Sequence, residues 1–177
     1  MNNDIKKVLF SEQDIEEGIL KLASKLNEDY KDKNPLFVGL LKGVIPFIGD
    51  LTKKIECFCE IDYIRVRSYE GKTPSGTLNL SGYVPDVKGK DVIIVDDILD
   101  TGNTTNKIKK LFINAGAKSV KICVLLNKPE GRLVEIEPDY YCFDTPNEFV
   151  VGYGLDFNQK YRNLPYIGVL KEEVYER

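Results

Sequence analysis

Residues 92–105 read Val-Ile-Ile-Val-Asp-Asp-Ile-Leu-Asp-Thr-Gly-Asn-Thr-Thr, and this stretch decides the fold. Its four β-branched residues predict a buried strand, and the Gly, Asn and Thr residues after them predict a tight turn. Apolar residues then recur at the spacing of one helix face: Ile108, Leu111, Phe112 and Ala115. The stretch therefore predicts a strand, a turn and a helix, with three carboxylates at the C-terminal end of the strand.

The predicted turn has the composition of a phosphate site. The first N–H groups of a helix have no partner within the helix, and they face one spot that suits a phosphate dianion. The carboxylates of Asp96, Asp97 and Asp100 attract cations instead. Helix capping alone would need one such residue and not three carboxylates. A P-loop and a dinucleotide-binding turn are excluded, because G-K-[ST] and G-x-G-x-x-G are missing.

Length and composition predict one domain, spanning residues 1–177, with a full core. There are 25 basic and 28 acidic residues and no basic run, so we expect no nucleic-acid partner. No apolar run reaches the length of a signal peptide core or a membrane span. We therefore expect a cytoplasmic protein with no membrane partner.

The four cysteines and the absence of histidine limit the kinds of catalytic and metal site that the chain can form. The four cysteines are scattered and indicate neither a zinc site nor a disulfide framework. The chain contains no histidine, so proton transfer near neutral pH must use a carboxylate, Lys, Tyr or Cys.

Strands and helices alternate along the chain. A capping box at 11–14 opens an amphipathic helix, and a helix follows a buried strand at 36–41. Further strands are expected at 58–69, 120–126 and 140–143, with a long polar loop at 70–77. This order predicts an α/β fold with a mostly parallel central sheet flanked by helices.

Three predicted strand ends carry polar residues, namely Lys42, the stretch 96–104, and Lys128. In parallel sheets, ligands bind beyond the carboxyl ends of the strands. We expect these residues to meet in one crevice.

The acidic pair followed by D-T-G-x-T resembles the phosphoribosyl-diphosphate signature of the type I phosphoribosyltransferases. The resemblance implies that the turn wraps the 5′-phosphate and that the acidic pair, Asp96 and Asp97, faces the ribose hydroxyls and a Mg²⁺ site. The turn residues are Asp100, Thr101, Gly102, Asn103 and Thr104. Two departures stand out: Asp96 replaces the usual Glu, and Asn103 occupies a variable position.

Residues 149–157 (Phe-Val-Val-Gly-Tyr-Gly-Leu-Asp-Phe) and 160–170 narrow the resemblance to the hypoxanthine-guanine phosphoribosyltransferases. That resemblance implies a type I phosphoribosyltransferase fold with a small hood, or base-binding region. It also implies that Phe149 stacks on the purine, Val150 offers main-chain groups to the base, and Lys128 donates to a 6-oxo group. An ammonium only donates, so it selects a carbonyl over an exocyclic amine.

The remaining roles also come from the resemblance. Lys42 and Gly43 match the pyrophosphate loop, with a cis peptide expected at Leu41-Lys42, and Arg162 matches a pyrophosphate contact. Asp156 matches a contact to the base and to the metal. Ser68 and Tyr69 match the start of a catalytic loop, and we expect residues 71–77 to form a lid over the pyrophosphate.

Together these features predict transfer of a phosphoribosyl group from phosphoribosyl diphosphate to hypoxanthine or guanine, with Mg²⁺ as cofactor and Asp100 as the base. The resemblance implies a homodimer or homotetramer. Two alternatives remain open: a regulator that senses phosphoribosyl diphosphate without catalysis, and a transferase for xanthine or a pyrimidine.

Overall fold

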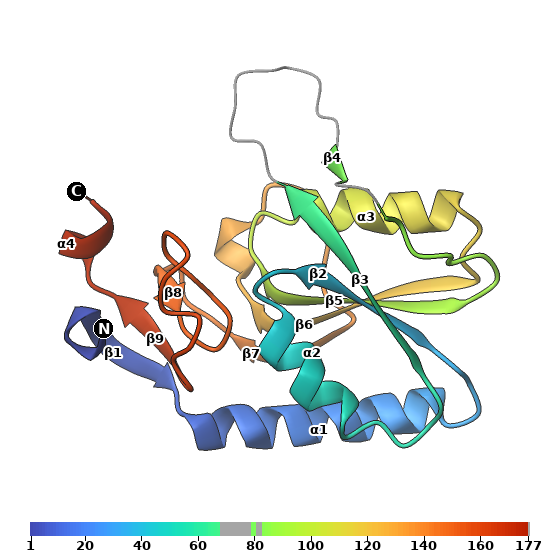
Figure 1. The fold of residues 1–177 in the computed structure, drawn as a ribbon, viewed down its shortest axis with the longest axis horizontal. Helices are drawn as coiled ribbons and strands as arrows, with labels where there is room; N and C mark the ends of the chain where they lie inside the picture. Colours follow the sequence, from blue (N-terminus) through green and yellow to red (C-terminus); the bar gives the residue numbers. More distant parts are fainter. Residues whose placement is uncertain (68–78, 81–82, 177) are drawn as a thin grey trace.

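A computed structural model describes residues 1–67, 79–80 and 83–176 of the chain. Within those residues a central sheet contains six strands (Figure 1). Their spatial order is β4 (Asn79–Leu80), β3 (Glu60–Arg67), β2 (Leu36–Leu41), β5 (Asp91–Leu99), β6 (Ser119–Asn127) and β7 (Tyr140–Asp144). All neighbours pair in parallel except the short β4, which runs antiparallel to β3. The predicted α/β fold is confirmed.

The central strand β5 is longer than the four β-branched residues indicated. It continues to Leu99 and pairs with β6 through Asp96, Ile98 and Leu99. The acidic pair therefore lies within the strand, and the turn begins at Asp100. The pairing with β2 ends at Val95, so of the described strands β6 alone holds the backbone of β5 at the acidic pair.

Helices cover both faces of the sheet (Figure 1). α1 (Glu12–Tyr30) and α2 (Ile45–Thr52) lie on one face and α3 (Asn103–Asn114) lies on the other. Successive residues of β5 divide accordingly: Ile93 and Val95 join the core under α1 and α2, while Val92 and Ile94 join the core under α3. This arrangement explains why residues 92–95 are apolar at every position.

The helix boundaries follow local signals. Ser11 caps α1 in the predicted capping box, where its hydroxyl accepts from the Asp14 N–H at 3.1 Å. Ile108 and Phe112 are fully buried on α3, as predicted. The expectation for Ala115 is wrong: the helix ends at Asn114, so Ala115 turns out of the apolar face and is exposed.

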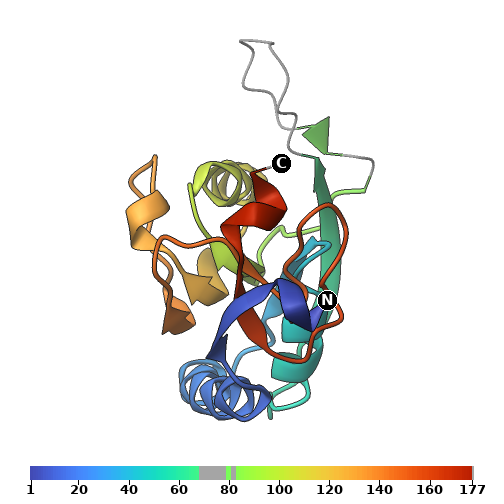
Figure 2. The same cartoon turned by 90° about the vertical axis from the view of Figure 1, so that its left-hand side faces the viewer.

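A separate antiparallel sheet forms the hood, in the order β1 (Ile5–Phe10), β9 (Ile167–Leu170) and β8 (Val150–Val151). A 3-10 helix, η1 (Asn2–Asp4), precedes it, and α4 (Glu172–Tyr175) follows it. Figure 2 shows the hood from its own side, with both ends of the described chain near it. The hood therefore joins segments from opposite ends of the sequence.

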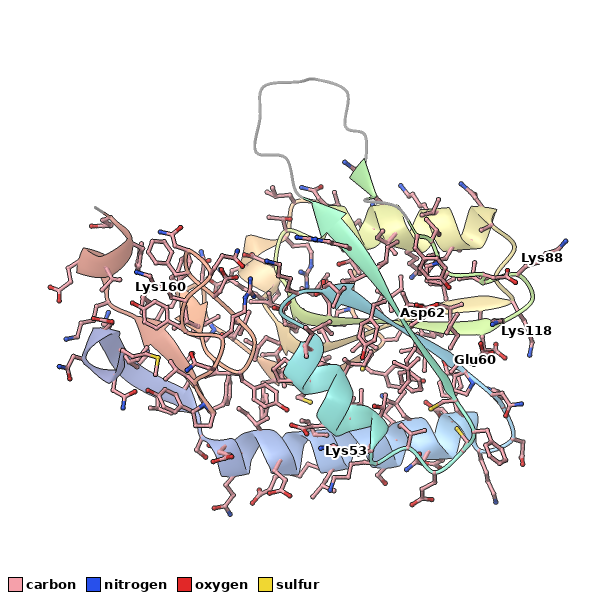
Figure 3. All side chains as sticks on the ribbon, viewed as in Figure 1. Lys53, Glu60, Asp62, Lys88, Lys118 and Lys160 are labelled. Atoms are coloured by element: carbon pink, nitrogen blue, oxygen red, sulfur yellow. The ribbon has the colours of Figure 1, made fainter. Side chains whose placement is uncertain are left out.

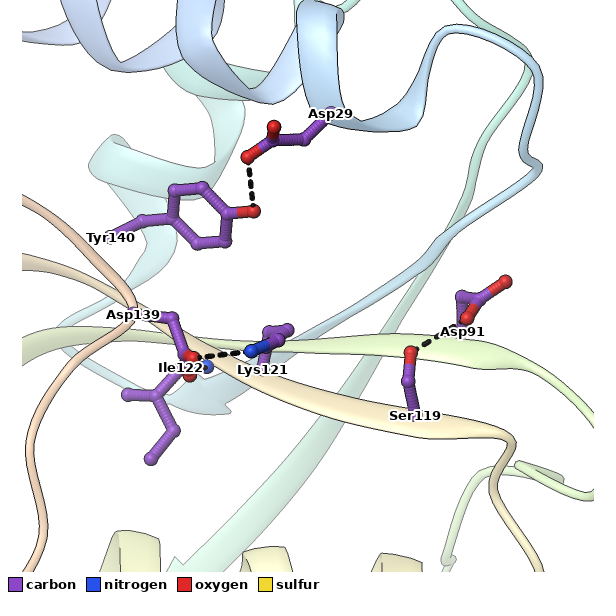
Figure 4. A network of polar contacts seen from close by, with 7 residues as sticks. All are labelled: Asp29, Asp91, Ser119, Lys121, Ile122, Asp139 and Tyr140. Carbon is purple, nitrogen blue, oxygen red and sulfur yellow. Dashed lines mark hydrogen bonds and ion pairs between the residues drawn. The ribbon is translucent and has the colours of Figure 1, made fainter.

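The end of the sheet remote from the hood is held by polar contacts. The Asp139 carboxylate accepts from Lys121 Nζ and from the Ile122 N–H, each at 2.8 Å. The Tyr140 hydroxyl donates to Asp29 on α1 at 2.7 Å (Figure 4). Burial and the Asp29 contact raise the pKa of Tyr140. Lys118, which is labelled in Figure 3, pairs with Asp91 on β5, with 2.9 Å between Nζ and the carboxylate oxygen. These contacts fix α1 and the strand starts, away from the C-terminal strand ends.

Candidate active site

The C-terminal ends of β2 and β5 open into a cavity of about 380 Å³. It lies where the strand order reverses, because β3 lies on one side of β2 and β5 on the other. Such a switch point is the usual ligand site of a parallel sheet. Ten of the predicted site residues line the cavity: Lys42, Gly43, Asp96, Asp97, Asp100, Thr101, Gly102, Thr104, Asp156 and Arg162.

The turn that follows β5 leads directly into α3. Gly102 has φ of 77°, a left-handed conformation that glycine adopts without a steric penalty, and it forms the N-cap of α3. The first hydrogen bond of the helix runs from the Asn106 N–H to the Gly102 carbonyl, at 2.9 Å. The N–H groups before Asn106 have no acceptor within the helix. The turn and the helix start expected for a phosphate site are therefore present, and Thr101 and Thr104 line the cavity there.

The carboxylates of the acidic pair lie side by side in a partly buried position. Burial, then the charge of Asp97, raises the pKa of Asp96 well above its usual value. Burial also raises the pKa of Asp97, against opposing contributions from its hydrogen bonds and from Arg162. Two carboxylates placed together in this way favour the binding of a cation.

A cluster of charged and polar side chains lies across the cavity. Arg162 pairs with Asp156 at 2.8 Å and donates to the Gly154 carbonyl at 2.7 Å. Gln159 accepts from Lys42 Nζ at 3.1 Å and from Arg162 at 3.3 Å. Sequence reasoning missed Gln159, because no motif marks it. The expected cis peptide at Leu41-Lys42 is present.

Asp100 lines the cavity, and Lys128, which is not among the lining residues, lies against the Asp100 side chain. Lys128 Nζ lies 3.4 Å from an Asp100 carboxylate oxygen, and the Lys128 N–H donates to the Leu99 carbonyl at 3.1 Å. Gly131, in the 3-10 helix η2 (Pro129–Gly131), lies against the same carboxylate: a Cβ there would be 1.8 Å from Asp100 Oδ1. The predicted base and the predicted base-selecting lysine are therefore neighbours.

Arg132 is a second residue that sequence reasoning missed. Its guanidinium donates to the carbonyls of Leu99 and Asp100 and to the Asn127 side chain, and its side chain is only 10% exposed. Its stem also packs against Gly102, since a Cβ at Gly102 would lie 3.1 Å from Arg132 Cδ. Arg132 thus holds the backbone from which Asp100 and the phosphate turn project.

The predicted purine contacts do not all share one place: Asp156 lines the cavity, Lys128 follows β6 outside the lining, and Phe149 and Val150 lie at the hood. Phe149 precedes β8 and keeps 38% of its surface exposed, whereas Val150 is buried and pairs with Val169.

The remaining predicted site residues belong to the phosphate turn and the catalytic loop. In the turn, the Asn103 N–H is 3.4 Å from Thr101 Oγ1. Ser68, Tyr69 and the expected lid, 71–77, lie outside the described residues.

The metal prediction can be compared with the donor set. Asp96, Asp97 and Asp156 all line the cavity, and carboxylate oxygens are ligands that Mg²⁺ accepts. In the part of the chain that is described, however, no three acidic or cysteine side chains gather closely enough to hold a metal ion by themselves. These residues fit a Mg²⁺ ion that takes most of its ligands from substrate and water.

The phosphoribosyl transferase domain matches residues 7–158. This match covers most of the chain, so the chain is a member of the phosphoribosyltransferase family. Among the described residues, none of the helices has the length and apolar content needed to span a bilayer.

Close relatives cover almost the whole chain. It is 55% identical to the hypoxanthine-guanine phosphoribosyltransferase of Streptococcus pneumoniae, over 99% of this chain and 98% of that protein. A hypoxanthine phosphoribosyltransferase structure from Staphylococcus aureus has a TM-score of 0.95 and 43% identity, covering 100% and 97% of the two chains. A hypoxanthine-guanine phosphoribosyltransferase structure from Bacillus anthracis has a TM-score of 0.89 and 37% identity, covering 94% and 99%. Within the family, the chain belongs to the hypoxanthine-guanine phosphoribosyltransferases.

We predict that Arg132→Met lowers both stability and activity. Methionine keeps an apolar stem but leaves the Leu99 and Asp100 carbonyls without their charged donor, which costs about 2–4 kcal/mol of unfolding free energy. Urea denaturation followed by circular dichroism measures the loss, and Lys88→Met at an exposed position is the control. Stability equal to that of the control would show that Arg132 does not hold this backbone.

Proposed function

We propose that this chain transfers the 5-phosphoribosyl group of phosphoribosyl diphosphate to N9 of hypoxanthine or guanine and releases pyrophosphate. The observation that carries the proposal is the Asp100–Lys128 pair beside the phosphate turn, with Nζ and the carboxylate oxygen 3.4 Å apart. It places a donor for the base beside a proton acceptor that lines the cavity. We treat residues 1–177 as one such domain.

Phosphoribosyl diphosphate would be bound at two places. Its 5′-phosphate takes the turn formed by residues 100–104, where helix N–H groups and the α3 dipole favour an anion. Its pyrophosphate takes the opposite side, near Lys42 and Arg162. A pyrophosphate oxygen there would replace Gln159 as the acceptor for both cations.

The chemical step breaks the bond between C1 of the ribose and a pyrophosphate oxygen, and the electron pair leaves with pyrophosphate. N9 of the purine forms the new bond to C1. The N7 proton passes to the Asp100 carboxylate, which is 43% exposed on its side chain and faces the cavity. Lys42 and Arg162 stabilise the negative charge that develops on the leaving group.

Mg²⁺, when bound with substrate, supplies Lewis-acid stabilisation of the pyrophosphate oxygens. The side chains available to it are Asp96, Asp97 and Asp156. The side-by-side position of Asp96 and Asp97, where a cation would offset the repulsion that adds to burial in raising the pKa of Asp96, supports this assignment.

Selection of the base rests on Lys128, Phe149 and Val150. The Lys128 ammonium is a donor only, so it favours the 6-oxo group of hypoxanthine or guanine over the amino group of adenine. The exposed face of Phe149 offers a flat apolar platform, and the main chain of Val150 lies next to it. Ser68 and Tyr69 would complete the pyrophosphate side.

Assembly and location are part of the same proposal. Exposed apolar side chains near and on β3 (Phe58, Ile61 and Tyr63) support a homodimer or homotetramer. The four cysteines are free thiols, which supports a cytoplasmic location.

We predict that the wild-type enzyme uses hypoxanthine and guanine well and adenine and uracil poorly. In Lys128→Gln the gap between hypoxanthine and adenine should narrow by about tenfold, because Gln both donates and accepts. Values of kcat/KM for these four bases and xanthine measure both effects. Equal discrimination in wild type and variant would place the selectivity elsewhere, and transfer to xanthine alone would favour the xanthine alternative.

We also predict that Asp100→Asn folds and binds phosphoribosyl diphosphate but turns over about 10²–10⁴-fold more slowly, as expected when a positioned base is lost. Single-turnover rates and calorimetric binding separate the two effects. A variant within a few-fold of the wild-type rate would remove Asp100 as the base. A wild-type protein that binds phosphoribosyl diphosphate without transfer to any base would instead favour the sensor alternative.

A further inference from the structure

The ring of Phe149 is packed against aromatic rings from two other parts of the hood. Phe157 meets it edge-on, with ring centroids 5.6 Å apart and an interplanar angle of 89°. Tyr175 stacks on it, with centroids 5.0 Å apart and an angle of 22°. One face of the Phe149 ring is therefore covered, although 38% of the residue remains exposed.

Tyr175 is held there by the C-terminal helix. It is the last residue of α4, which follows β9 closely and lies at the hood end of the molecule (Figure 1). Tyr175 and Val174 pack against the buried hood cluster of Val151, Tyr161, Leu164 and Leu170. The stacking contact is thus part of a packed surface.

The backbone around Phe149 is fixed as well. The Leu170 N–H donates to the Phe149 carbonyl at 2.8 Å, and Glu148 pairs with Lys7 on β1 at 2.8 Å. The backbone contacts do not fix the orientation of the ring, because χ2 of a phenylalanine has a broad energy minimum. A stacked ring on one face and an edge contact together restrict that torsion.

We propose that Tyr175 is a positioning residue for the purine: it backs the ring of Phe149, so that the base stacks on the opposite face and three rings form one stack. This rests on the proposed function, in which Phe149 stacks on the purine. A ring already held in the bound orientation loses less freedom when the base binds. Offset-stacked rings also attract one another beyond the area they bury.

Binding and steady-state measurements on four variants test the role. We expect Tyr175→Ala and Tyr175→Leu to weaken the binding of guanosine monophosphate about 3–10-fold by calorimetry, and to raise the KM for hypoxanthine by a similar factor. Binding of phosphoribosyl diphosphate and kcat at saturating hypoxanthine should stay within twofold. Tyr175→Phe keeps the ring and should restore wild-type values, and Glu173→Ala, exposed on the same helix, is the control.

Each alternative has its own outcome. If Tyr175→Leu matches the wild type, apolar burial is enough and stacking is not required, which overturns the proposal. If Tyr175→Ala binds the nucleotide more tightly, Tyr175 occupies the place of the purine, which also overturns it. A parallel loss of phosphoribosyl diphosphate binding, with a lowered thermal unfolding midpoint, would show a structural role only. Failure of the proposed function itself is distinct, because wild-type protein would then neither transfer to hypoxanthine nor bind the nucleotide.

Discussion

The site depends on the tight packing of Gly43, whose backbone lies against the Asp97 carboxylate on one side and the backbone of Gly154 on the other. A Cβ on Gly43 would lie 1.7 Å from Asp97 Oδ2, and a Cβ on Gly154 would lie 2.0 Å from the Gly43 carbonyl oxygen. The loop after β2 is therefore held between the end of β5 and the hood segment, with no room for a side chain. This contact joins the large sheet to the hood and places Lys42 beside Arg162 through Gln159.

The charges of the site follow from that packing. The strand fixes Asp96 and Asp97 where burial raises the pKa of both. Across the cavity, Lys42 and Arg162 form a cationic side, while α3 directs the positive end of its dipole at the turn that precedes it. A substrate with two separate phosphate groups and an associated cation matches this distribution, because each charged group meets its opposite.

The sequence was informative where the signal is local. The strand from Val92, the turn through Gly102 and the capping box at Ser11 are each encoded by neighbouring residues, and all three are found. Positions that act through distant contacts gave no such signal. Arg132 and Gln159 matter only because the fold brings Leu99 and Lys42 to them, and the two-residue β8 is too short for any periodicity. The roles of the predicted site residues stay predictions until they are measured.

The most direct test is to add one methyl group at Gly43 and measure transfer to hypoxanthine. Gly49→Ala is the matched control, because a Cβ at Gly49, on α2, would meet nothing within 4 Å. We expect Gly49→Ala to retain wild-type kcat/KM, and Gly43→Ala to remain folded by circular dichroism but to lose at least about 10²-fold in kcat/KM, the scale on which small misplacements act. Wild-type kcat/KM in Gly43→Ala would contradict the central claim that this close approach builds the site.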